Sequence, residues 1–166
     1  MKKPTVYLDT TIFSVYHHRS SDVVTMSNRL KTREWWTAER EHFDHFVSRV
    51  VLQELRDGHY PWQRASLRMA SPFPRLRVTN QADELAAILI AKFVVPPEKP
   101  ADALQMEIAV AHSIDYLLTW NYSHLANPVA QHKLEQVLSS LKFRAPLMVS
   151  PDTIPQVRFG REPRRS

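Results

Sequence analysis

The residues that could do chemistry stand where apolar segments end or helices begin: Asp9, Glu54, Asp102 and Asn121. Asp9 closes the apolar run 4–9 and is followed by two hydroxyl residues, and Asn121 directly follows the apolar run 117–120. In open α/β sheets, ligands bind just outside the carboxyl ends of the strands. The four residues together therefore predict a cation site built from oxygen ligands.

Three acids at one edge of a sheet need a counterion. Two carboxylates about 5 Å apart repel each other by roughly 3 kcal/mol at an effective dielectric constant of about 20. A hard divalent cation removes this cost, and Mg²⁺ is held by a few carboxylates while keeping some of its waters. Such an ion can activate water and stabilise the transition state of phosphodiester hydrolysis. Asn121 could add an amide oxygen but no charge, so we expect weaker binding at a second metal position.

Each candidate residue also has a structural explanation. Asp102 falls in the first turn of a predicted helix, where an acid favours the helix dipole. Glu54 could pair with a neighbouring arginine, and Asn121 suits a turn. Asp9 is the hardest to explain in this way, because a charge at the end of a buried strand needs a partner.

Apolar runs and capping residues predict alternating strands and helices. Strands are expected at 4–9, 43–47, 76–78, 116–120 and 146–149, and helices at 10–18, 22–41, 48–58, 61–70, 79–93, 101–112 and 127–141. Ser48 and Asn127 are predicted helix N-caps, and Gly58 is a predicted helix end. Alternation of this kind favours parallel pairing with right-handed crossovers. The predicted fold class is α/β, a three-layer α/β/α sandwich with a mostly parallel central sheet.

Length and composition narrow the classes of function. With 166 residues we expect a single domain over 1–150 and a basic, mobile tail over 151–166. The chain has no cysteine, which excludes thiolate metal sites, disulfides and cysteine nucleophiles. It has two glycines and neither a GxGxxG nor a Walker A loop, which sets aside nucleotide cofactors bound by such loops. The net charge of +5 favours nucleic acid as a partner.

The first residues do not resemble a signal peptide. The apolar stretch 4–8 is short and Asp9 ends it, and no segment reaches the roughly 20 apolar residues that a membrane span needs. We therefore expect a cytoplasmic protein with no membrane partner.

Four segments resemble the four sequence blocks of PIN domains, in the family's order and at similar spacing. They are VYLDTT at 6–11, VLQEL at 51–55, PADAL at 100–104 and LLTWN at 117–121. The resemblance covers about residues 4–150, and the last two blocks look most like bacterial VapC-like toxins and their stand-alone relatives. It implies an α/β/α fold and a Mg²⁺- or Mn²⁺-dependent ribonuclease, the toxin component of a type II toxin–antitoxin system.

Carried over to this sequence, the resemblance implies roles for particular residues. Asp9, Glu54 and Asp102 would be catalytic metal ligands, and Thr10 would line the substrate site. Asn121 joins the catalytic set, although it stands where many members have a fourth Asp. The implied partners are RNA, a cognate antitoxin protein and a second copy of the chain, because the early helical region often forms dimer contacts in VapC-like proteins. Relatives often carry a histidine at the position of Gln105, so we assign no role to that residue.

Two other functions remain open. The substitution at Asn121 leaves the acidic set one charge short, which favours a non-catalytic PIN-like module that binds RNA or a protein. A phosphatase of the haloacid dehalogenase type also begins with a strand and an Asp. That family needs a second Asp two residues after the first, where this chain has Thr11.

Overall fold

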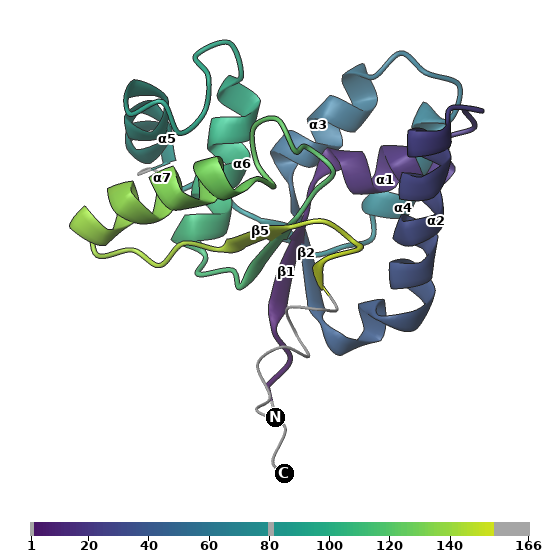
Figure 1. Ribbon diagram of the computed structural model, residues 1–166, viewed down its shortest axis with the longest axis horizontal. Coiled ribbons are helices and arrows are strands. Elements are labelled where there is room, and N and C mark those ends of the chain that lie inside the picture. The colour runs from purple at the N-terminus through teal and green to yellow at the C-terminus, as the bar shows by residue number, and fades with distance from the viewer. Residues whose placement is uncertain (1, 80–81, 155–166) are drawn as a thin grey trace.

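The computed structural model describes residues 2–79 and 82–154 (Figure 1). Most of the predicted basic tail, residues 155–166, lies outside the described residues. The part of the tail that is described ends in Ile154, which is fully buried. No helix within the described ranges is long and apolar enough to cross a membrane.

A five-stranded sheet forms the centre of the molecule, in the order β3-β2-β1-β4-β5. Every pair of neighbouring strands is parallel. The strands are β1 (Thr5–Leu8), β2 (Asp44–Ser48), β3 (Arg75–Leu76), β4 (Tyr116–Leu118) and β5 (Leu147–Val149). The fold class predicted from the sequence is therefore confirmed.

Helices cover both faces of this sheet. They are α1 (Thr10–His17), α2 (Val23–Ala38), α3 (Arg49–Asp57), α4 (Gln63–Ala70), α5 (Ala82–Ala91), α6 (Pro100–Ala111) and α7 (Pro128–Ser140), with a short 3-10 helix η1 (Arg40–His42). From β1 the chain passes through β2 to β3 on one side, and later through β4 to β5 on the other. Right-handed crossovers then place α1 to α4 on one face and α5 to α7 on the opposite face, as Figure 1 shows.

The predicted helix boundaries agree with the structure where a side chain supplies the cap. Asn127 accepts a hydrogen bond from the amide of Ala130 at 2.8 Å, and Ser48 accepts one from the amide of Val50 at 3.2 Å. Gly58 ends α3 as expected, but its φ is −64°, so no left-handed backbone requires a glycine there. A Cβ at position 58 would instead overlap the ring of Tyr60.

The interior of the sheet explains why the first strand is so apolar. Val6, Tyr7 and Leu8 of β1 are all fully buried, because this strand has a neighbour on each side and helices on both faces. Trp35 of α2 is only 1% exposed and belongs to the same core. Tryptophan side chains can stack on nucleic-acid bases, but the indole of Trp35 is buried and is not available for such a contact.

One buried polar contact connects the central strand to the helix that carries Glu54. The hydroxyl groups of Tyr7 and Ser48 lie 2.7 Å apart. The Ser48 oxygen also caps α3 by accepting from the amides of Val50 and Val51. A single buried hydroxyl thus fixes the start of α3 relative to β1.

We expect Ser48→Ala to lower the free energy of unfolding by about 2–3 kcal/mol, because it removes a helix cap and leaves the Tyr7 hydroxyl buried without a partner. Urea unfolding of Ser48→Ala, Tyr7→Phe and the double variant measures the coupling. The double variant should lose less than the sum of the single losses. Strictly additive losses would contradict a direct Tyr7–Ser48 interaction.

Candidate functional site

The candidate site lies where the strand order changes direction. β1 and β4 are neighbours in the sheet, but their following connections lead to opposite edges. Such a switch point leaves a crevice at the carboxyl ends of the two strands, where open α/β sheets bind ligands. Asp9 directly follows β1, and Thr119 to Asn121 follow β4. Both segments therefore lie at the carboxyl ends of their strands, as the sequence predicts.

Asp9 is a buried carboxylate, 3% exposed, held by several donors. It caps α1 by accepting from the amide of Thr10 at 2.7 Å. Its other oxygen accepts from the hydroxyl groups of Thr11 and Thr119, each at 2.6 Å. These contacts tie the end of β1 to the start of α1 and to the end of β4, and they fix the direction of the carboxylate.

Glu54 reaches the site from α3. One of its carboxylate oxygens accepts from the hydroxyl of Thr10 at 2.5 Å and from the amide nitrogen of Gln105 at 2.7 Å. Burial, joined by the negative charges of Asp9 and Asp102, raises the pKa of Glu54 from 4.5 to about 7. Thr10 thus contacts Glu54, while its role in lining a substrate site stays a prediction.

Asp102 and Asn121 meet across the crevice. The amide nitrogen of Asn121 donates to Asp102 at 3.1 Å, and its amide oxygen accepts from the backbone of His124 at 3.0 Å. Burial and then the charge of Asp9 raise the pKa of Asp102, although the hydrogen bond from Asn121 opposes the rise. The Asn121 side chain thus serves both a turn and the acidic cluster.

Gln105 is a site residue that the sequence analysis did not assign. Its side chain is 1% exposed and donates to Glu54, while its amide oxygen has no hydrogen-bond partner within the described residues. Gln105 follows Asp102 by three positions, so the two side chains share one face of α6. This spacing of three residues is the sequence signal that could have placed Gln105 in the site. The comparison with relatives that carry a histidine at this position led us to assign it no role.

Few cations of the described residues act on the three acids: the charges of Lys99 and His124 lower the pKa of Asp102 without forming an ion pair with it. Within the described residues, Asp9, Glu54 and Asp102 form no ion pair with lysine or arginine. They interact electrostatically, but no three His, Asp or Glu side chains in the described ranges are close enough to hold a metal ion together.

This donor set fits a hydrated ion better than a closed cage. Mg²⁺ needs only one or two carboxylates and keeps several waters, so the three acids need not converge on it. Asp9, Glu54 and Asp102 offer carboxylate oxygens that form no ion pair with lysine or arginine within the described residues. The residues present therefore fit hydrated Mg²⁺ or Mn²⁺.

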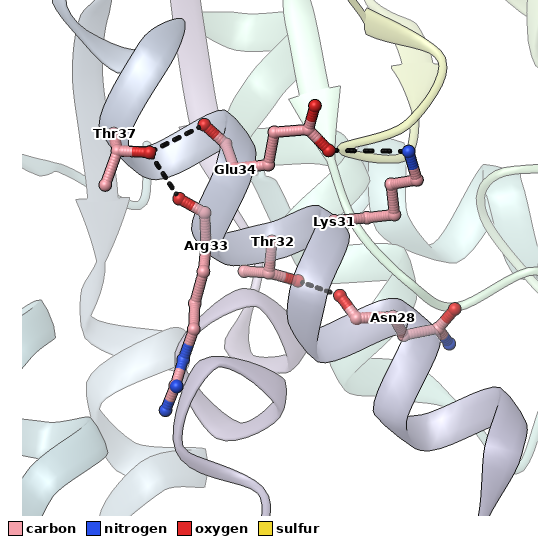
Figure 2. A network of polar contacts seen from close by, with 6 residues as sticks. All are labelled: Asn28, Lys31, Thr32, Arg33, Glu34 and Thr37. Atoms are coloured by element: carbon pink, nitrogen blue, oxygen red, sulfur yellow. Dashed lines mark hydrogen bonds and ion pairs between the residues drawn. The ribbon is translucent and has the colours of Figure 1, made fainter.

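A buried hydrogen bond connects the site to α2. The indole nitrogen of Trp120, next to Asn121, donates to the Thr32 hydroxyl at 2.8 Å. Figure 2 shows that this hydroxyl also bonds within α2, where it donates to the backbone oxygen of Asn28 at 2.7 Å. The ion pair between Lys31 and Glu34 in the same view is exposed and contributes little. Thr32 thus anchors the segment that carries Asn121.

Comparisons with known proteins find structural similarity but no match to a family model or a curated sequence. The structure resembles that of VapC20 from Mycobacterium tuberculosis, a toxin that cleaves the sarcin-ricin loop, with a TM-score of 0.49 and 15% sequence identity. The match covers 68% of this chain and 87% of VapC20. A similarity of this degree concerns the course of the backbone and assigns no function to this chain.

The raised pKa of Glu54 has a consequence for stability. A folded-state pKa of about 7, against 4.5, means that stability falls as the pH rises from 4.5 towards 7. Glu54→Gln keeps the acceptor oxygen and removes the charge. We expect it to stabilise the metal-free protein at pH 8 by about 1–2 kcal/mol, a value discounted because the side chain is part exposed.

Melting temperatures in a chelator, measured from about pH 4 to 8, check this prediction, and about 3–6 °C is the expected gain at the upper end. The difference between Glu54→Gln and the parent protein should vanish near pH 4. Glu41→Gln, which changes an exposed glutamate of η1, is the control and should have no such effect. A gain that does not depend on pH would contradict the electrostatic explanation.

Proposed function

We propose that this protein is a metal-dependent endoribonuclease that hydrolyses RNA phosphodiester bonds with Mg²⁺ or Mn²⁺. The observation that carries the proposal is the gathering of Asp9, Glu54 and Asp102 at the switch point of a parallel sheet, with no lysine or arginine of the described residues paired to them. The pKa of Glu54 and that of Asp102 are both raised by burial and by neighbouring carboxylates, so the cluster is costly to the fold. A divalent cation removes that cost.

Some residues of the site would bind the ion, and others would position the side chains that bind it. Asp9, Glu54 and Asp102 would bind the cation, which supplies an activated water and stabilises the developing negative charge when bound. Thr10 and Gln105 both donate to the same carboxylate oxygen of Glu54, so neither of these hydrogen bonds occupies its second oxygen. Asn121 orients Asp102 through its amide nitrogen, so we assign it to positioning within the catalytic set.

Wider assignments rest on the four sequence blocks that resemble VapC-like toxins. We propose that the chain is the toxin of a type II toxin–antitoxin system, that it pairs with a cognate antitoxin and forms a homodimer, and that it acts in the cytoplasm. We further propose that residues 1–150 form a single PIN-like domain. The net charge of +5 is consistent with an RNA substrate.

One pair of observations favours a second candidate, a PIN-like module that binds RNA or protein without cleaving it. Asn121 stands where the resemblance to PIN domains implies a fourth Asp, and no three acidic or histidine side chains within the described residues are close enough to hold a metal ion together. The two candidates differ in their response to metal. A nuclease requires Mg²⁺ or Mn²⁺ for turnover, whereas the binding module would neither bind nor need it.

The nuclease proposal predicts that Asp9→Asn and Asp102→Asn each lower the rate of RNA cleavage by at least about 100-fold. Asparagine still caps a helix, so α1 should persist in Asp9→Asn. Asp102 makes fewer contacts that hold the fold, which makes Asp102→Asn the cleaner variant. Cleavage of a mixed RNA panel by purified protein in Mn²⁺ and Mg²⁺ measures the effect, with circular dichroism to verify folding.

A chelator should abolish cleavage by the parent protein, and Glu41→Gln, which changes an exposed acid of η1 away from the site, should preserve it. Full cleavage by a folded Asp102→Asn variant would contradict the proposal. An absence of cleavage by the parent protein in both metals would favour the binding module.

Restoring the missing acid gives a readout independent of turnover. Asn121→Asp replaces a 3.1 Å hydrogen bond to Asp102 with a like charge, so we expect the metal-free protein to lose about 1–3 kcal/mol at pH 8. The stabilisation by added Mn²⁺, measured as the rise in melting temperature, should be larger than in the parent protein. An unchanged response to Mn²⁺ would contradict a cation site at Asp102.

A further inference from the structure

An open groove with a volume of about 680 Å³ lies beside the acidic site. Residues of α3 form one wall, and Arg75 of β3 and Ala101 of α6 contribute to the others. Glu54 lines the groove, and Ala101 immediately precedes Asp102. A molecule in this groove would therefore contact Glu54 and would lie against the first turn of α6, which carries Asp102.

Three arginines line this groove, and all three are exposed: Arg49, Arg56 and Arg75. Arg49 and Arg56 are seven residues apart on α3, which places them on the same side of the helix about 10 Å apart along its axis. Arg75 comes from β3, the edge strand of the sheet, where it pairs in register with Val47 of β2. The arginines thus approach the groove from two separate elements.

The guanidinium groups of these arginines are not used by the described part of the fold. None of the three donates a hydrogen bond or forms an ion pair there. Other arginines do have such a role. Arg29 and Arg33 bond backbone oxygens at 3.0 and 3.1 Å.

The acids of the groove do not neutralise the arginines. Asp57 accepts from Gln53 at 2.9 Å instead of pairing with an arginine, and Glu54 bonds Thr10 and Gln105. Among the described residues, the three groove arginines therefore have no ion-pair partner and are available to a ligand.

Arginines beside a cluster of carboxylates can bind a polyanion whose reacting group must come close to those carboxylates. The carboxylates of the site repel the phosphates of a nucleic acid, so the backbone needs cationic contacts close by. Arginine is well suited to this, because its planar guanidinium can hold a phosphate by two hydrogen bonds.

The size of the groove favours one strand over two. A volume of about 680 Å³ is within the range of pockets that enclose small ligands. Duplex RNA is instead recognised across a long surface that spans about 16 base pairs. A short length of a single strand is therefore the better fit.

We propose that this groove binds the sugar–phosphate backbone of single-stranded RNA on one side of the scissile bond, through Arg49, Arg56 and Arg75. The choice of RNA rests on the proposed ribonuclease function. The groove places the flanking phosphates against α3 and leaves the scissile phosphate to the acids. Because the contacts are to the backbone, they strengthen binding without selecting a base sequence.

The test is a titration of a short fluorescent single-stranded RNA in a chelator, followed by anisotropy at a series of KCl concentrations. Each phosphate contact contributes about 0.7 to the slope of log affinity against log salt for a single strand. The variant with Arg49→Ala, Arg56→Ala and Arg75→Ala should therefore lose about 2 from that slope. It should also bind at least about 10-fold more weakly at low salt.

The matched control removes the same amount of charge elsewhere, by Lys3→Ala, Arg64→Ala and Lys92→Ala, three exposed residues that do not line the groove. It should retain the slope of the parent protein. An unchanged slope in the groove variant, or an equal loss in the control, would overturn the assignment. Binding of a duplex of the same sequence with the same dependence on the groove arginines would overturn the choice of a single strand.

Cleavage measured separately in Mn²⁺ keeps this inference distinct from the ribonuclease proposal. If the parent protein binds RNA through the groove but does not cleave it, the ribonuclease proposal fails and the groove assignment stands. If the parent protein cleaves RNA and the groove variant cleaves and binds equally well, the groove assignment alone fails.

Discussion

The whole arrangement depends on one buried negative charge at the end of the central strand. A carboxylate that leaves water must be met by donors, and Asp9 receives them from the start of α1 and from the hydroxyl of Thr119 beyond β4. Meeting this requirement joins three elements at one point. The same requirement fixes the direction of the carboxylate, so the group that organises the fold is also the group that faces the crevice.

The other two acids are held less completely, and the difference is informative. Glu54 and Asp102 receive their hydrogen bonds from uncharged groups, the amides of Gln105 and Asn121 and the hydroxyl of Thr10. Neutral donors orient a carboxylate without cancelling its charge. The cluster thus keeps its attraction for a cation and accepts some loss of stability, a trade that is common where a binding site is built into a fold.

The sequence predicts the backbone of the site better than its details. The caps at Ser48 and Asn127 are local signals, and the helix starts that they predict are confirmed, whereas the predicted strand 116–120 already ends at Leu118. The contact between Gln105 and Glu54 joins residues 51 positions apart, and no local pattern contains it. In the same way, Tyr7 reads as one more apolar residue of a buried strand until the fold brings Ser48 to its hydroxyl.

The groove arginines show another limit of sequence reasoning. Arg49 and Arg75 are separated by two helices in the chain, and they come together because β3 pairs with β2 at the edge of the sheet. The short strand β3 has only two residues, so its sequence signal is weak. Charge alone predicted a polyanionic partner, but only the strand order indicates where that partner could lie.

The pairing of β1 with β4 also orders events in time. Thr5 bonds Asp115 across 110 positions of sequence, and Asp9 and Thr119 are separated by the same interval. A ribosome releases the chain from its first residue onward, so β1, β2 and β3 are made long before β4. Contacts of such separation form late, because a long loop must close before they are gained. A nascent chain therefore carries Asp9 and Glu54 before Asp102 and Asn121, the residues that would complete the site, have been synthesised.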